Sequence, residues 1–259
     1  MNCGLNLFDP SFVGVVGKPS SNIDDTDLKA YWKFNQTSGD VTEDSQAAAA
    51  LGDPADLQIT GATYNQSTSP FVSMLFDGVN DGAVAGTSLS QFNFMHNTSA
   101  LWTVVWWMRA NTLRNNDLVI NTDNLNAGGQ IGFDIRVRAD GSFQVVILGA
   151  GGEPINKVTT TSYIPDTTNF YFYLFTYDQA PSTNNLKVHR DDANLEQFTK
   201  SAATPDNNNA KGVNTVGKNS QVANDFLHGN IAEMSVWNKV MSGADQTSLY
   251  NSGSGFEIY

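Results

Sequence analysis

The sequence predicts an all-β fold, in which two antiparallel sheets form a sandwich and one short helix lies near the C-terminus. Three observations support this prediction. Short segments alternate apolar with polar residues, turn residues separate these segments at close spacing, and no long amphipathic segment supplies the crossover helices that parallel strands need. The strands are therefore expected to pair antiparallel.

The clearest alternation lies at residues 132–139, where Phe133, Ile135 and Val137 alternate with polar residues. Asp140-Gly141 follows and predicts a hairpin turn. The other segments with a strand pattern are residues 28–34 (with Leu28, Ala30, Trp32 and Phe34 on one face), 74–76, 83–85, 143–148, 186–189 and 231–237.

Two further strands carry many of the aromatic residues. Residues 101–108 (LWTVVWWM) are apolar on both faces, which indicates a central strand covered on both sides. Residues 170–177 (FYFYLFTY) are rich in aromatic side chains, which favour a pleated and packed surface.

A short helix is predicted after residue 242. Ser242 and Asp245 have the spacing of an N-terminal cap, and Leu249 and Tyr250 supply apolar contacts. Gly253 stands where the helix is expected to end.

The composition indicates one globular domain with a sizeable core. Of the 259 residues, 40% are hydrophobic and 15% are charged, which argues against disorder. The formal net charge of −12 repels nucleic acid, so we expect no nucleic-acid partner. Cys3 is the only cysteine, which excludes an intrachain disulfide.

Residues 1–26 differ from the rest and form a separate segment before the domain, which we place at 27–259. Their apolar residues follow neither a strand nor a helix period. Two interpretations stay open: a flexible leader, or an extended arm that docks on a protein partner. The residues expected to dock are Leu5, Leu7, Phe8 and Phe12.

The first residues carry neither a basic region nor a continuous apolar stretch, so we expect no signal peptide. No segment approaches the roughly 18 apolar residues of a membrane span. These observations predict a protein made in the cytoplasm. A homo-oligomer is compatible with the sequence, although no heptad pattern supports one.

Several spaced motifs resemble one known family. They are Tyr31-Trp32-Lys33-Phe34, Phe76-Asp77-Gly78-Val79-Asn80-Asp81, residues 102–109 (WTVVWWMR), Tyr177-Asp178, Asp191-Asp192, residues 229–238 (GNIAEMSVWN) and residues 249–253 (LYNSG). Their order and spacing resemble the laminin-G-like, concanavalin A-like lectin/glucanase superfamily, in its pentraxin-like branch. The resemblance implies a jelly-roll sandwich with one concave sheet. It leaves function open, because this fold carries lectins, glycosidases, adhesion modules and structural domains.

The resemblance also implies a candidate calcium site, because relatives often hold Ca²⁺ with oxygen ligands from loops. We expect no obligatory cofactor, and Ca²⁺ is the candidate ion. Ala232 departs from the family pattern, since many relatives have an acidic residue there. The alternative is that these residues only form turns and loop caps. The candidate ligands are Asp40, Asp44, Asp77, Asn80 and Asp81, with Asp44 and Asp81 preferred.

Carbohydrate binding predicts aromatic rings that stack on sugars. A Trp or Tyr in a strand is more often a core residue, and one face of residues 101–108 must be core, so at most half of the candidates are free to bind. The candidates are Trp102, Trp106, Trp107, Tyr171 and Tyr173.

An enzyme is disfavoured. Glycoside hydrolysis needs two carboxylates across one cleft, and the glucanase relatives carry theirs as Glu-x-Asp-x-x-Glu on one strand. The glutamates here lack that spacing, the histidines lack metal-ligand spacing, and no nucleophile elbow or phosphate loop is present. The residues concerned are Glu43, Glu153, Glu196, Glu233, Glu257, His96, His189 and His228.

Two functions therefore remain, with a glycoside hydrolase as a remote third. The first hypothesis is a non-catalytic, lectin-like protein displayed on a virus or phage particle as a decoration or attachment protein, anchored to a larger assembly by residues 1–26. The second is a calcium-assisted adhesin that binds glycans. The lone cysteine, the expected absence of a signal and the acidic surface favour the first.

Overall fold

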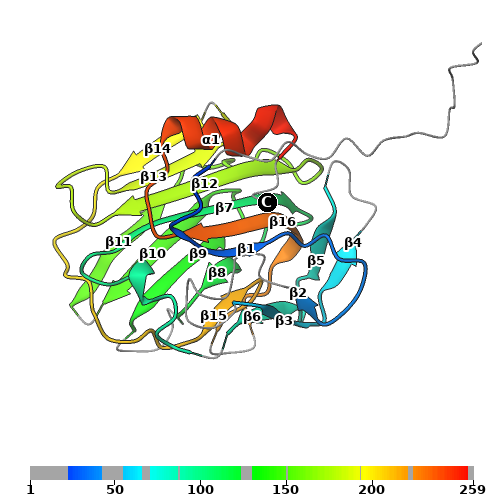
Figure 1. Ribbon diagram of the computed structural model, residues 1–259, viewed down its shortest axis with the longest axis horizontal. Coiled ribbons are helices and arrows are strands. Elements are labelled where there is room, and N and C mark those ends of the chain that lie inside the picture. The colour runs from blue at the N-terminus through cyan, green and yellow to red at the C-terminus, as the bar shows by residue number, and fades with distance from the viewer. Residues whose placement is uncertain are drawn as a thin grey trace, which may run out of the picture.

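The computed structural model describes residues 23–42, 55–65, 71–86, 88–123, 130–149, 151–192, 194–220 and 224–255. They form two antiparallel sheets stacked as a sandwich, with one short helix (Figure 1). The all-β prediction is thereby confirmed. No helix among these residues is long and apolar enough to cross a membrane.

The first sheet has a seven-strand path, and one further strand, β1, pairs with β16. Its strands in spatial order are β14 (Asn194–Phe198), β13 (Leu186–Arg190), β12 (Tyr171–Asp178), β7 (Leu101–Ala110), β16 (His228–Trp237), β5 (Ser73–Asp77) and β4 (Thr63–Asn65), with β1 at Leu28–Trp32.

The second sheet packs against the first. Its strands in spatial order are β11 (Gly152–Val158), β10 (Phe143–Gly149), β9 (Gly132–Val137), β8 (Asp117–Asn121), β15 (Asn214–Val216), β6 (Gly82–Ala85), β3 (Leu57–Thr60) and β2 (Val41–Thr42). The predicted hairpin at Asp140-Gly141 joins β9 to β10, and Phe143 pairs with Val137.

Strand β7 is covered on both sides, as its sequence predicts. Trp102, Val104 and Trp106 belong to the cluster between the sheets, whereas Val105 and Trp107 belong to a second cluster on the outer face of the first sheet. We call these the inner cluster and the outer cluster.

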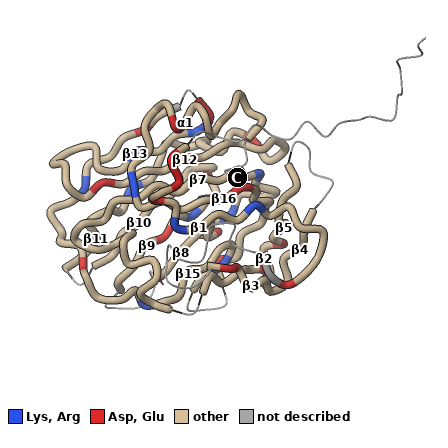
Figure 2. Tube along the Cα trace, in the orientation of Figure 1, with Lys and Arg blue, Asp and Glu red and all other residues tan. Residues whose placement is uncertain are grey.

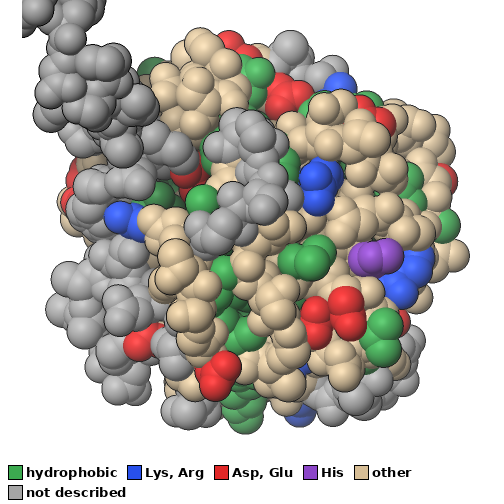
Figure 3. All heavy atoms as spheres, turned by 90° about the vertical axis from the view of Figure 1, so that its right-hand side faces the viewer, with side chains coloured by type: hydrophobic (Ala, Val, Ile, Leu, Met, Phe, Trp, Pro, Cys, Tyr) green, Lys and Arg blue, Asp and Glu red, His purple; other side chains and the backbone are tan. Residues whose placement is uncertain are grey.

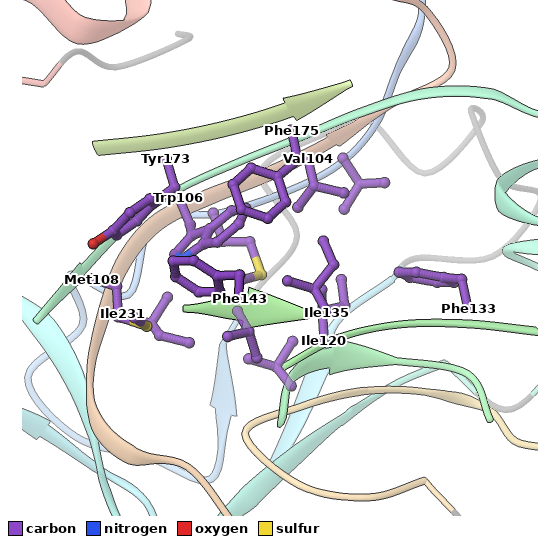
Figure 4. Packing of buried hydrophobic residues seen from close by; sticks show 14 of the residues in the cluster. Val104, Trp106, Met108, Ile120, Phe133, Ile135, Phe143, Tyr173, Phe175 and Ile231 are labelled. Carbon is purple, nitrogen blue, oxygen red and sulfur yellow. The ribbon is translucent and has the colours of Figure 1, made fainter. Parts of the chain in front are cut away.

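Aromatic contacts dominate one region of the inner cluster (Figure 4). The Trp106 ring stacks on Tyr173 with centroids 5.4 Å apart and meets Phe175 edge-on at 4.7 Å. Phe143, from the second sheet, meets Tyr173 edge-on at 4.9 Å. Since such pairs contribute beyond their buried area, this contact joins the two sheets firmly.

Helix α1 (Gly243–Tyr250) covers the outer cluster. Ser242 and Asp245 form the predicted capping box, so this prediction is confirmed. Tyr250 stacks on Trp107 with centroids 5.9 Å apart. The helix ends at Tyr250, because Asn251, two residues before Gly253, adopts the left-handed conformation that ends helices. The 3₁₀ turns lie at Asn93–Met95 and Asn251–Gly253.

The face assignment of Leu28 was wrong. The sequence groups Leu28 with Ala30 and Trp32, but Leu28 lies in the outer cluster. The pairing of β1 with β16 is irregular between Leu28 and Ala30, and such an irregularity breaks the alternation of faces.

Of the segment 1–26, only residues 23–26 are described, and they contact the first sheet. Ile23 packs on the outer cluster, and the Lys239 ammonium donates to the carbonyl oxygen of Asp24 at 2.6 Å. The proposed docking residues Leu5, Leu7, Phe8 and Phe12 lie outside the described residues.

We expect Trp106→Ala to lower the free energy of unfolding by about 3–5 kcal/mol, because the variant opens a cavity at the contact between the sheets. The control is Leu89, which is 42% exposed. Leu89→Ala should change the free energy of unfolding by less than about 0.5 kcal/mol. Urea unfolding measures both. A loss near 1 kcal/mol for Trp106→Ala would show that the core repacks around the missing ring.

Candidate functional site at the loop end of the sandwich

The polar side chains that line the two pockets described below lie at one end of the sandwich. The register fixes this, since Asp77 pairs with His228, Ala110 with Gly229 and Met108 with Tyr171. The connections that meet here are 78–81, 111–116, 138–142, 159–170, 191–192 and 224–227, and we call them together the loop end.

Acidic and basic residues are spread along many elements of the chain (Figure 2). On the visible part of the side view, charged side chains lie among polar ones, and apolar side chains are scattered (Figure 3).

The first pocket, which we call the Tyr-Arg pocket, has a volume of ≈ 230 Å³. Its charged groups come from the β13–β14 hairpin. Arg190 pairs with the core residue Tyr173, and Glu196 pairs with the core residue Val188, so both charged residues face the space between the sheets. The lining residues are Thr160, Ser162, Tyr163, Arg190, Leu195 and Glu196.

Arg190 is held in a fixed orientation. Its guanidinium lies 5.5 Å from the Tyr163 ring centroid and 5.8 Å from that of Tyr171. Nη1 donates to the carbonyl oxygen of Tyr163 at 2.9 Å, and Nε lies 3.6 Å from an Asp191 carboxylate oxygen. No described residue accepts a hydrogen bond from Nη2 or from Nε, and Nε is buried.

Glu196 is the acceptor of the pocket. Its carboxylate receives hydrogen bonds from the Thr160 backbone N–H at 3.1 Å and from the Thr160 hydroxyl at 2.7 Å. Ser162 has a positive φ of 63°, and its N–H donates to the carbonyl oxygen of Asp140. Gly141 permits this approach, because a Cβ there would meet Ser162 Cα at 3.2 Å.

The second pocket, which we call the rim pocket, has a volume of ≈ 370 Å³. Arg114, Asn115 and Asp117 line one part of it, after strand β7. Asn224, Asp225 and Phe226, just before β16, line another part, together with Gly78.

Arg114 ties three segments of the loop end together. Its guanidinium donates to the carbonyl oxygens of Gly78 at 2.9 Å and Phe226 at 2.6 Å, and to the Asp117 carboxylate at 3.3 Å. Burial raises the pKa of the Asp117 carboxyl, and the Arg114 charge opposes that rise. Arg114 therefore acts as a structural anchor of the rim pocket.

In the turn at residues 77–81, the Asp77 and Asp81 carboxylates accept hydrogen bonds from backbone N–H groups of the same turn. Asp77 Oδ1 accepts from the N–H of Val79 at 2.7 Å, and Asp81 Oδ2 accepts from the N–H of Asp77 at 2.7 Å. The Val79 bond lowers the pKa of Asp77, whereas burial raises that of Asp81. Asn80 and Asp40 are exposed, and Asp44 lies outside the described residues. Within the described ranges, no three His, Cys, Asp or Glu side chains gather as a metal site.

Most of the predicted sugar-stacking residues lie in the core. Trp102, Trp106 and Tyr173 are 0% exposed, and Trp107 lies under Phe71 and Tyr250. Rings buried in this way cannot stack on a sugar from solvent, so the structure contradicts these four assignments. Tyr171 differs, because it is half-buried at the loop end and flanks Arg190.

Sequence reasoning missed Tyr163, Arg190 and Glu196 as site residues. One signal for them is present. The strand at 186–189 alternates, and continuing its period places Arg190 on the same face as the buried Leu186 and Val188. A charge at a core-facing position near the end of a strand indicates either edge protection or a binding site.

The family model for the concanavalin A-like lectin/glucanases superfamily matches residues 77–245. The chain belongs to this superfamily. No curated protein sequence matches the chain.

Solved structures share the fold at low identity. The receptor binding domain of botulinum neurotoxin D matches with a TM-score of 0.63 and 12% identity, over 88% of this chain and 53% of that one. The binding domain of botulinum neurotoxin DC in complex with SialylT matches with a TM-score of 0.58 and 14% identity, over 87% and 51%. Trypanosoma rangeli sialidase in complex with sialic acid matches with a TM-score of 0.60 and 12% identity, over 94% and 37%. This chain thus spans about half the length of the neurotoxin binding domains and about a third of the length of the sialidase.

We expect Arg114→Ala to lower the free energy of unfolding by about 2–3 kcal/mol, because it leaves the buried Asp117 carboxylate without its cation. Arg138→Ala is the control, since the Arg138 side chain makes one hydrogen bond, to Gln144. It should cost less than about 1 kcal/mol. Urea unfolding measures both losses. Equal losses would mean that Arg114 does not anchor the loop end.

We expect Asp81→Ala to lower the melting temperature by the same amount in calcium chloride and in a chelator. The physical reason is that the variant leaves the Asp77 N–H without its acceptor, which costs about 1–3 kcal/mol. Asn80→Ala should leave the melting temperature unchanged both in calcium chloride and in the chelator. A loss confined to the calcium buffer would identify Asp81 as a metal ligand.

Proposed function

We propose that this superfamily domain is a non-catalytic carbohydrate-binding module, and that the Tyr-Arg pocket holds one sugar residue. The observation that supports this most directly is the pairing of a fixed cationic donor, Arg190, with an anionic acceptor, Glu196, in one pocket of ≈ 230 Å³.

A pyranose offers neighbouring hydroxyl groups that each donate and accept. One hydroxyl accepts from Arg190 Nη2, and the next donates to Glu196. Because both protein groups are charged, these hydrogen bonds are of the stronger kind. The exposed Ser162 and the 46% exposed Leu195 complete the lining with a hydroxyl and an apolar surface.

Charge favours a neutral sugar. The chain carries a net charge of −12. An anionic sugar would bind the Arg190 guanidinium, but the Asp191 carboxylate already lies close to it. An additional carboxylate therefore meets repulsion, whereas a hydroxyl does not.

The names of two structural relatives support a glycan as the ligand class. One neurotoxin binding domain is in complex with SialylT, and the sialidase is in complex with sialic acid. These names describe those proteins, and at 12–14% identity the likeness supports the class of ligand only through the shared fold.

The non-catalytic part of the proposal rests on the carboxylates. Glu196 is the one acidic residue that lines the Tyr-Arg pocket. The acidic residues of the rim pocket are Asp225 and Asp117, and Asp117 is already engaged by Arg114 and by the N–H of His228, so neither pocket holds two uncommitted carboxylates. Hydrolysis with two carboxylates needs one free to donate a proton and one free to activate water or attack.

Display on a particle surface remains a separate proposal. It rests on residues 1–26 as a docking arm, of which residues 1–22 lie outside the described ranges. Deleting residues 1–22 should abolish attachment to the larger assembly while the domain stays folded. Normal attachment of the truncated protein would remove the arm hypothesis.

The binding proposal is tested first on a printed glycan array that contains neutral, amino and sialylated oligosaccharides, with and without calcium. We expect neutral glycans to be bound without calcium. Glu196→Gln should then weaken the best-bound glycan about tenfold in calorimetric titration, because a charge-assisted hydrogen bond becomes a neutral one.

Glu153→Gln is the matched control. Glu153 lies outside both pockets, where it accepts a hydrogen bond from Asn156. The control should bind as the unmodified protein does. An empty array, or equal affinities for both variants, would refute the pocket as the site, and new reducing ends in the bound glycan would refute the non-catalytic assignment.

A further inference from the structure

The turn at 138–142 is hydrogen-bonded to one lining residue of each pocket, Ser162 and Asn115. On one side, the N–H of Ser162 donates to the carbonyl oxygen of Asp140 at 2.9 Å. On the other side, the N–H of Ala139 donates to Asn115 Oδ1 at 3.1 Å. Since Ala139 and Asp140 are consecutive residues, one turn of backbone contacts lining residues of both pockets.

The rim pocket presents groups that suit a second sugar. Asn115 and Asn224 are exposed, and the Asn224 side chain makes no hydrogen bond to any described residue. The Asn115 amide nitrogen is likewise free, because only its oxygen is engaged, by Ala139. An amide both donates to and accepts from a hydroxyl.

Asp225 and Phe226 add a carboxylate and an apolar ring beside these amides. Asp225 Oδ2 receives one long hydrogen bond of 3.4 Å from Asn219, which leaves Oδ1 as an acceptor. Asp225 lines the pocket and has a positive φ of 55°. This backbone conformation is strained for a residue other than glycine. Half-buried Phe226 supplies a surface for the apolar face of a sugar.

The volumes argue for a ligand larger than one sugar. Pockets for drug-sized ligands begin at roughly 300 Å³. The Tyr-Arg pocket, at ≈ 230 Å³, is smaller than that, and the neighbouring rim pocket, at ≈ 370 Å³, is larger. A ligand of one sugar in the Tyr-Arg pocket would leave the larger neighbouring pocket unused.

We propose that the loop end binds an oligosaccharide of at least two sugar residues, which crosses the 138–142 turn and places one end in each pocket. This inference rests on the proposed carbohydrate-binding function and deepens it. It assigns Asn224 and Asp225 to the second subsite, and it makes affinity depend on chain length. The anchor Arg114 shapes this subsite, since its own donors are engaged.

The test uses the full chain and the best-bound glycan of the array, together with its fragments down to the single sugar that binds the Tyr-Arg pocket. We expect the oligosaccharide to bind at least tenfold more tightly than the single sugar. Asn224→Ala should remove most of that gain, about five- to tenfold, and leave the affinity for the single sugar unchanged.

Asn208→Ala is the matched control. Asn208 is also exposed, its side chain makes no hydrogen bond to a described residue, and its loop contacts residues 96–98 near the opposite end of β7. It should change neither affinity. Because both asparagines are exposed, neither variant is expected to lose stability, and melting temperatures verify this.

The outcomes separate the two proposals. If Glu196→Gln weakens every fragment and Asn224→Ala weakens none, the Tyr-Arg pocket stands and the second subsite is refuted. If Asn224→Ala weakens the single sugar as much as the oligosaccharide, the second subsite is also refuted. If no glycan binds, both proposals fall together.

Discussion

The burial of β7 on both faces is the constraint on which the rest of the structure depends. Its inward residues Trp102 and Trp106 join the two sheets, and its outward residue Trp107 requires a cover, which Tyr250 of helix α1 provides. Because closely packed interiors tolerate little change in volume, this strand fixes the separation of the layers and the place of the helix. The loops at its end are held by that rigid frame.

The same constraint explains why the candidate site lies at the loop end and not on the aromatic strands. Strands β7 and β12 use their aromatic rings to hold the sandwich together, and a ring in the core is lost to ligand binding. Polar groups that converge on a ligand must then come from the connections and from the ends of strands. The pair Arg190 and Glu196 does so, because the β13–β14 hairpin carries charge on its inward face at the edge of the sheet.

One ion pair of the second sheet lies inside the domain, and its two side chains satisfy each other. Arg136 donates two hydrogen bonds to the fully buried Asp134 carboxylate, at 2.5 and 3.0 Å. Burial raises the pKa of Asp134 to about 6, although the Arg136 charge opposes the rise. Arg190 differs from Arg136, because only its Nη1 donates a hydrogen bond to a described residue.

The sequence by itself determined the all-β class, the doubly covered strand, the Asp140-Gly141 hairpin and the capped helix, because each depends on neighbours within a few residues. It did not predict β2, β4 or β15, which are too short to show a period, nor the longer strands β3, β8, β11 and β14. It also did not predict the irregularity that moves Leu28 to the outer face. It also gave no way to join Tyr163 with Arg190, or Asn115 with Asn224. Only the tertiary structure decided those pairs, because they are far apart along the chain and meet only once the two sheets have packed.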